Sequence, residues 1–190
     1  MLAKNSIYVI IDAIQIPVTT TPPTGTVTFL FTDIEGSTRL SQQYPEAMPV
    51  LLARHNAILS QAIEAHNGLV FQIIGDSFSA AFPSASDALC AALAAQRSLY
   101  QEPWSPAPIK VRMGIHTGTA QAEAGSGEIR YSGYTTLALT QRIMSAGHGG
   151  QILLSRIAQE LTRDKLPEQA ELMDMGECTL KDILHPERKK

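Results

Sequence analysis

The chain has 190 residues, of which 44% are hydrophobic and 17% charged, and its formal net charge at neutral pH is −3. This length suits one domain with a substantial core, and the apolar content excludes a disordered chain, which could not offset the entropy of ordering. The small negative charge provides no broad basic field, so we expect no nucleic acid and no membrane among the partners.

The two cysteines, Cys90 and Cys178, lie far apart and form no CxxC pair, so neither a zinc site nor a disulfide framework is indicated. A reducing, cytoplasmic setting fits best. The apolar run from Ile7 to Ile16 is about ten residues long, well short of the roughly 20 that a membrane-spanning helix needs. We interpret residues 1–24 as an N-terminal extension that ends in a Pro/Thr-rich linker, residues 25–184 as the domain, and 185–190 as a tail.

The first half of the domain shows clear periodicities. Residues 26–33 are β-branched and aromatic, which predicts a buried strand, and residues 48–65 place their apolar positions on one helical face that ends at Asn67-Gly68. Two short strands over 69–74 and 78–82 flank Gly75-Asp76-Ser77, which is a hairpin signature. An alanine-rich helix follows over 84–100, capped by Ser84 or Ser86.

The second half continues the alternation. Residues 109–119 predict a strand, and residues 121–133, with three glycines, predict a mobile surface loop or arm. Helices over 136–146 and 157–162 then flank a strand over 151–155, and a β-rich stretch runs to about residue 184. Strands interleaved with helices, some joined by hairpins, predict an α+β sheet with helices on its faces.

Two aspartates are the strongest candidates for chemistry. Asp33 ends the first strand and Asp76 lies at the hairpin tip, and for Asp76 alone a turn-forming role is favoured. If the two strands are neighbours, both carboxylates lie at one end of the sheet, and a divalent cation would relieve their repulsion. Mg²⁺ is commonly bound by one or two carboxylates together with phosphate oxygens, so the pair predicts a metal and triphosphate site. The turn after Asp33, which includes Gly36, Ser37 and Thr38, offers free backbone N–H groups to phosphate.

The segment from Phe31 to Thr38 (FTDIEGST), followed by Ile74-Gly75-Asp76, closely resembles the metal-binding motifs of the bacterial class III adenylate and guanylate cyclase catalytic domains. The segments 112–118 (RMGIHTG) and 142–154 (RIMSAGHGGQILL) are also similar to that family. The resemblance implies a ferredoxin-like core of βαββαβ type and a head-to-tail homodimer whose active sites are shared between the two chains. It also implies that Asp33, Asp76 and the backbone carbonyl of Ile34 hold two Mg²⁺ or Mn²⁺ ions per active site.

The resemblance further implies conversion of a purine nucleoside triphosphate, with ATP favoured over GTP, to a 3′,5′-cyclic nucleotide and pyrophosphate. Arg142 matches the arginine that stabilises the developing charge on the phosphate. Lys181 is similar to a lysine that contacts phosphates, although a plain surface lysine is an equal alternative.

The sequence departs from the family pattern at the positions that read the substrate. Gln72 replaces the usual base-reading lysine, the second base-reading position falls on Tyr131, and Ala138 replaces an asparagine. Because Gln72 both donates and accepts, it does not discriminate between purines, and loss of the asparagine removes an orienting hydrogen bond, which often costs about 10²-fold in rate. Activity is therefore expected to be low. A catalytically inactive nucleotide-binding module for dimerisation or regulation, and cyclisation of a pyrimidine triphosphate, stay open as alternatives.

Overall fold

The computed structural model describes residues 21–125, 128–167, 170–178 and 187–188. Its sheet has six strands. Five follow the order β2-β3-β1-β4-β5, and β6 pairs with the first half of β4. Neighbouring strands are antiparallel except for β4 and β6, which are parallel. The strands are β1 (Gly25–Ile34), β2 (Leu69–Ile74), β3 (Ser77–Phe82), β4 (Val111–Gly125), β5 (Glu128–Ser132) and β6 (Ile152–Leu154).

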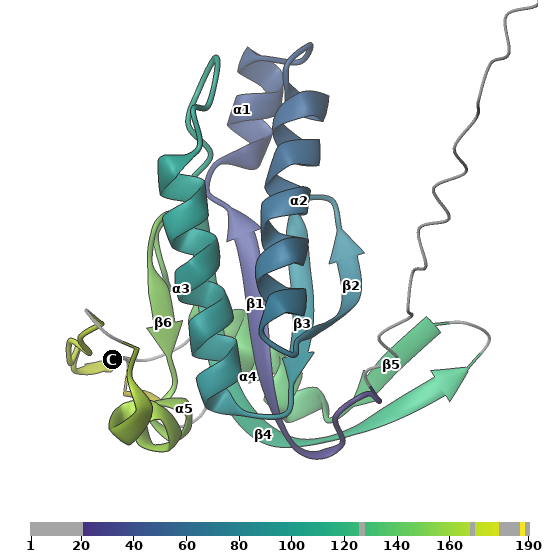
Figure 1. The fold of residues 1–190 in the computed structure, drawn as a ribbon, viewed down its shortest axis with the longest axis vertical. Helices are drawn as coiled ribbons and strands as arrows, with labels where there is room; N and C mark the ends of the chain where they lie inside the picture. The colour runs from purple at the N-terminus through teal and green to yellow at the C-terminus, as the bar shows by residue number, and fades with distance from the viewer. Residues whose placement is uncertain (1–20, 126–127, 168–169, 179–186, 189–190) are drawn as a thin grey trace, which may run out of the picture.

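Helices cover both faces of this sheet. Figure 1 shows α1, α2 and α3 on the near face and α4 behind the sheet. The expected α+β architecture with helices on its faces is confirmed. The helices are α1 (Ser37–Gln43), α2 (Met48–Ala65), α3 (Ala85–Gln101), α4 (Tyr134–Ser145) and α5 (Arg156–Thr162), followed by a short 3₁₀ turn (Arg163–Lys165).

The strand β1 separates two apolar clusters because its side chains alternate between the faces. Leu30 and Ile34 belong to the larger cluster, which packs beneath α2 and α3. Phe29 and Phe31 belong to a smaller aromatic cluster on the opposite face, where the α4 residue Met144 also packs. Asp33 has the same parity as these phenylalanines and therefore lies on the face that α2 and α3 leave uncovered.

Residues 121–133 were predicted as a loop or an arm, and the described residues form an arm of paired strands rather than a loop. The strand β4 continues to Gly125 and pairs with β5 in an antiparallel hairpin, which extends to one side of the sheet in Figure 1. The glycines suggested a loop, but Ala122 pairs with Tyr131 and Ala124 with Ile129. Strand pairing of these alternating residues outweighs the local flexibility of glycine.

The predicted β-rich stretch towards residue 184 is largely absent from the described residues. Only β7 (Glu177–Cys178) is a strand there, and it pairs with β8 (Glu187–Arg188). Residues 179–186 lie outside the described part of the chain. Within the described part, no helix combines the length and the apolar character needed to cross a membrane.

Candidate active site

Asp33 and Asp76 come from different parts of the sheet and meet at one end of it. Asp33 is the last but one residue of β1, and Asp76 lies in the tight turn between β2 and β3, where Gly75 adopts a positive φ of 61°. Asp76 Oδ2 accepts a 3.0 Å hydrogen bond from the backbone N–H of Ile34, and Ser77 Oγ donates a 2.8 Å hydrogen bond to Asp33 Oδ1. The Asp76 carboxylate is thus hydrogen-bonded to the residue after Asp33, and the Asp33 carboxylate to the residue after Asp76.

The second oxygen of Asp33 forms an ion pair with Arg112 of β4. The guanidinium donates from Nε at 3.0 Å and from Nη2 at 2.5 Å to Asp33 Oδ2. The two residues face each other across the antiparallel β1–β4 ladder, and their side chains are 18% and 30% exposed for Asp33 and Arg112 respectively. This partial exposure leaves the pair accessible to a competing cation or anion.

The turn after Asp33 leads directly into α1. Gly36 adopts a left-handed conformation, with φ of 70°, and no side chain caps the helix that begins at Ser37. The first intrahelical bond is donated by Leu40 to the carbonyl of Gly36. The amides of Ser37 and Thr38 come before that bond, so they lie in the first turn, whose N–H groups have no intrahelical acceptor.

Gln72 and Tyr131 line one cleft, of about 720 Å³, between β2 and β5. Gln72 is exposed, and the exposed side chains of Ile73 and Ile74 lie next to it on the same strand. Tyr131 packs edge to face on Phe71 and Phe29, at centroid distances of 4.9 and 5.2 Å. Its hydroxyl is buried with no hydrogen-bond partner among the described residues, and burial raises the pKa of Tyr131 to about 12.

Arg142 and Ala138 lie one turn apart on α4, outside its buried stripe. That stripe consists of Thr136, Leu139, Thr140, Ile143 and Met144. A β-carbon on Gly114 would come within 2.4 Å of the Met144 backbone nitrogen, so the C-terminal end of α4 lies against the start of β4, close to Arg112. Because 3.6 residues make one turn, Arg142 lies well round the helix from the contact with β4. The Arg142 side chain therefore points away from the sheet of its own chain. Its position along α4 is near the end of the sheet where Asp33 lies.

Two buried histidines support the fold near this site. His55 of α2 packs edge to face against Phe78. Burial lowers the pKa of His55 because it disfavours the charged ring, although Asn56, Asp76 and Asp33 oppose the shift. His116 of β4 shares a 2.8 Å hydrogen bond with Ser155, and burial lowers its pKa to about 4. Their burial and these contacts are those of structural histidines.

The oxygen donors at the sheet end suit a hard divalent cation. Two carboxylates and a nearby backbone carbonyl are the ligands that Mg²⁺ or Mn²⁺ prefers. Among the described residues, no group of three or more His, Cys, Asp or Glu side chains forms a closed metal cage. The remaining ligands would therefore come from a bound polyphosphate and water, as is usual for Mg²⁺. Lys181 lies outside the described residues.

Sequence reasoning missed Arg112 and the role of Ser77. Arg112 was predicted only as part of the segment 112–118, and Ser77 only as part of the hairpin turn, and neither was connected to Asp33. A partial signal was present, since Asp33 lies at the end of one predicted strand and Arg112 near the start of another. Only the β1–β4 register places them opposite each other.

Comparison with known proteins gives a consistent result. The family model described as the adenylate and guanylate cyclase catalytic domain matches residues 19–189. An uncharacterised protein of Mycobacterium tuberculosis is 42% identical over 168 residues, which cover 87% of this chain and 55% of the relative. An adenylate cyclase of Neurospora crassa is 30% identical over 182 residues, covering 85% of this chain and 8% of that protein. The chain thus spans about half the length of the mycobacterial relative.

Solved structures agree with this result. An adenylate cyclase from Trypanosoma brucei, in its monomeric state, superposes with a TM-score of 0.80 at 26% identity, covering 89% of this chain and 90% of that one. The adenylyl cyclase CyaB from Pseudomonas aeruginosa has the same fold, with a TM-score of 0.75 at 24% identity and coverage of 87% and 92%. Because the family model matches nearly the whole chain, the protein belongs to the class III adenylate and guanylate cyclase catalytic domain family.

Proposed function

We propose that this domain converts a purine nucleoside triphosphate to a 3′,5′-cyclic nucleotide and pyrophosphate at sites shared by two chains. The single observation that carries the proposal is the reciprocal hydrogen bonding of the Asp33 and Asp76 segments at one sheet end. Two carboxylates held this closely, with Arg112 and the first turn of α1 beside them, suit a cation-bound polyphosphate.

In this proposal Asp33, Asp76 and the backbone carbonyl of Ile34 hold two divalent cations. Bound there, Mg²⁺ or Mn²⁺ would neutralise the triphosphate and make the ribose 3′-hydroxyl easier to deprotonate. The amides of Gly36, Ser37 and Thr38 would accommodate phosphate oxygens.

The reaction balances without any further reagent. The 3′-oxygen forms a bond to the α-phosphorus, the bond from that phosphorus to the α,β-bridging oxygen breaks, and pyrophosphate leaves while the hydroxyl proton passes to solvent. Arg142 would bind the phosphoryl oxygens as charge moves towards the leaving group. A guanidinium is suited to this role because its fork of N–H donors matches phosphate oxygens.

Arg142 would act on the active site of the partner chain. It lies outside the buried stripe of α4, at the sheet end that carries Asp33, so a head-to-tail arrangement would bring it to the second chain's carboxylates. The exposed Ile73 and Ile74, on the edge strand beside the aromatic cluster, provide apolar surface for such a dimer. Lys181 of the same family pattern would add a phosphate contact.

The cleft that holds Gln72 and Tyr131 is the proposed base site. Gln72 offers both a donor and an acceptor to a purine edge, and Tyr131, whose hydroxyl is buried, lines the same cleft with its ring. The name of the Neurospora crassa relative, an adenylate cyclase, supports ATP over GTP. Ala138 contributes no hydrogen bond from its side chain, so we expect a low rate.

The test is a panel of the four ribonucleoside triphosphates, each incubated with the purified protein and Mn²⁺ and assayed for cyclic product. We expect slow formation of cyclic AMP, less cyclic GMP, and loss of both in Asp33→Ala. Absence of any cyclic product above the Asp33→Ala background would refute the proposed activity.

A second candidate is a dimerising module that binds nucleotide without turnover. The observation that favours it is the Arg112 ion pair, which already occupies one oxygen of Asp33, together with the substituted Gln72 and Ala138. This candidate predicts metal-dependent nucleotide binding with no product. The double variant Gln72→Lys, Ala138→Asn would then create activity, whereas rapid turnover by the wild type would exclude this candidate.

A further inference from the structure

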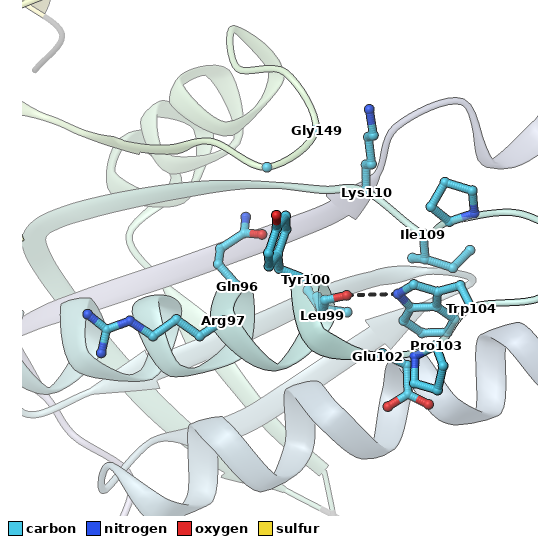
Figure 2. Close-up of a pocket in the computed structure, with 12 residues that line it drawn as sticks. Gln96, Arg97, Leu99, Tyr100, Glu102, Pro103, Trp104, Ile109, Lys110 and Gly149 are labelled. Atoms are coloured by element: carbon cyan, nitrogen blue, oxygen red, sulfur yellow. Dashed lines mark hydrogen bonds between the residues drawn. The ribbon is translucent and has the colours of Figure 1, made fainter.

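A second cavity lies beside the C-terminal end of α3, and it shares no lining residue with the cleft that holds Gln72. It is open to solvent and has a volume of about 690 Å³. It is lined by the C-terminal part of α3, the segment that leads into β4, and Gly149 and Gly150 (Figure 2). Its size falls in the range of small-molecule sites. None of the proposed catalytic residues lines it.

The wall of this cavity is mainly apolar and is held in place. Trp104 donates a 2.8 Å hydrogen bond from its indole nitrogen to the carbonyl of Leu99, which closes the end of α3 (Figure 2). The indole N–H is therefore occupied, and the ring offers apolar contact only. Leu99 and Ile109 are buried beside it, and Pro103 and Pro108 complete the rigid wall.

The charged groups at the cavity do not cancel. Glu102, the acidic residue in the lining, is paired with Arg54 at 2.7 Å. Lys110 and Arg97 also line the cavity, and no ion pair or hydrogen bond of either side chain occurs among the described residues. Figure 2 shows Lys110 extending from the Ile109 side of the cavity and Arg97 extending from α3 on the opposite side. The Glu35 carboxylate lies beside Gly149 and is 3.7 Å from His148, so it borders the cavity without lining it. The lining itself therefore combines an apolar wall with two exposed cations.

We propose that this cavity binds a small organic anion with an apolar body, such as an aliphatic or aromatic carboxylate. The apolar part packs on Trp104, Ile109 and the two prolines, and the carboxylate pairs with Lys110, with Arg97 as the second cation. An uncharged ligand would leave both cations without a partner, and an inorganic anion would leave the apolar wall exposed. Neither alternative uses both features of the cavity.

The chain contains one tryptophan, so the emission of Trp104 reports on this cavity directly. The probe is octanoate, titrated into the full chain without nucleotide or metal, and octanamide is the matched uncharged probe. We expect a saturable change in Trp104 emission with octanoate, and binding of octanamide about tenfold weaker, because the charge-assisted contact is lost.

Single-residue variants test whether the positive charge at the cavity contributes to binding without a change in the fold. Lys110→Gln, an exposed position, is expected to weaken octanoate binding about fivefold, and the double variant Lys110→Gln, Arg97→Gln to weaken it further. Arg156→Gln, an exposed arginine on α5 outside the cavity, should leave the affinity unchanged. Equal binding of octanoate and octanamide would show a cavity that selects apolar groups alone and would overturn the proposal. So would an unchanged affinity in the double variant, or no saturable change in Trp104 emission.

Discussion

At the scale of single residues, the Asp33 carboxylate is held by two kinds of partner. Ser77 donates to one oxygen and Arg112 to the other, and the Arg112 pair is only partly buried. Partly exposed pairs contribute about 1 kcal/mol or less because solvent screens them. In the proposed function, a divalent cation would therefore displace Arg112 from Asp33 at modest cost, and the guanidinium would become available to a bound phosphate.

The first prediction concerns this displacement. Arg112→Gln should raise the affinity for Mn²⁺ alone, without nucleotide, by about fivefold, because the competing cation is removed. The same variant should bind ATP in the presence of Mn²⁺ more weakly, since a phosphate partner is lost. Titration of free Mn²⁺ by electron paramagnetic resonance measures the first effect and calorimetry the second. Arg54→Gln, which breaks the remote pair with Glu102, is the control. Unchanged or weaker Mn²⁺ binding in Arg112→Gln would contradict this account of Asp33.

The second prediction concerns His116. Burial lowers its pKa to about 4, whereas the unfolded chain protonates near 6.5, so between these values the unfolded state binds more protons. Stability should therefore fall as the pH drops from about 6.5 to about 4, by on the order of 3 kcal/mol, and level off below. His55, whose pKa is also lowered by burial, adds to the same trend.

Urea unfolding of the wild type and of His116→Gln, at several pH values between 4 and 7, measures this slope. The variant should show a shallower loss of stability in the acid range. Identical pH slopes for the two proteins would show that His116 is not the group that titrates.

At the scale of elements, the packing of α4 on β4 depends on the lack of side chains at two positions. A β-carbon on Gly114 would lie 2.4 Å from the backbone nitrogen of Met144, and one on Gly118 would lie 2.6 Å from the Thr136 hydroxyl. The helix can approach the sheet closely only because these residues are glycines. This close approach sets the position of Arg142 relative to the sheet end.

The third prediction follows from that contact. Gly114→Ala should lower the free energy of unfolding by about 3 kcal/mol, because the added methyl meets helix backbone, which cannot rotate away. It should also reduce any cyclase activity through displacement of Arg142. Gly147→Ala is the matched control: its added methyl would come no closer than 3.3 Å to Leu153 and the Met144 carbonyl, so we expect a loss under about 1 kcal/mol. Thermal unfolding compares the two, and equal losses would contradict the proposed role of the contact.

The elements also show what sequence alone can predict. The helix over 48–65 and the hairpin around Asp76 were predicted with accurate bounds, because periodicity and turn residues are local signals. The β4–β5 hairpin was missed because its pairing depends on contacts between Ala122 and Tyr131 that glycines in the same segment obscure.

Some residues of the candidate site could likewise be predicted from the sequence, and others could not. Asp33 and Asp76 stand out in the sequence because each is an acidic residue at the end of a predicted strand. Arg112 does not stand out, because its importance depends on the register between β1 and β4. Gln72 and Tyr131 were linked only through the family pattern, and the cleft that they share arises from the meeting of β2 and β5.

At the scale of the whole molecule, one chain presents half of each proposed active site. Its carboxylates lie at the sheet end, while Arg142 faces away from the same sheet. A two-fold dimer would use both halves twice, so two variants with different defects can restore one intact site between them.

Mixing Asp33→Ala with Arg142→Ala, followed by an assay for cyclic AMP with Mn²⁺ and ATP, tests this claim most directly. Each variant alone should be inactive. The equimolar mixture should recover about a quarter of wild-type activity, because about half of the dimers are mixed and one of their two sites is intact. The contradicting result requires that the wild type is active and that exchange of subunits between the two variants is demonstrated. If the mixture is then still inactive, the site is not built from Asp33 of one chain and Arg142 of the other.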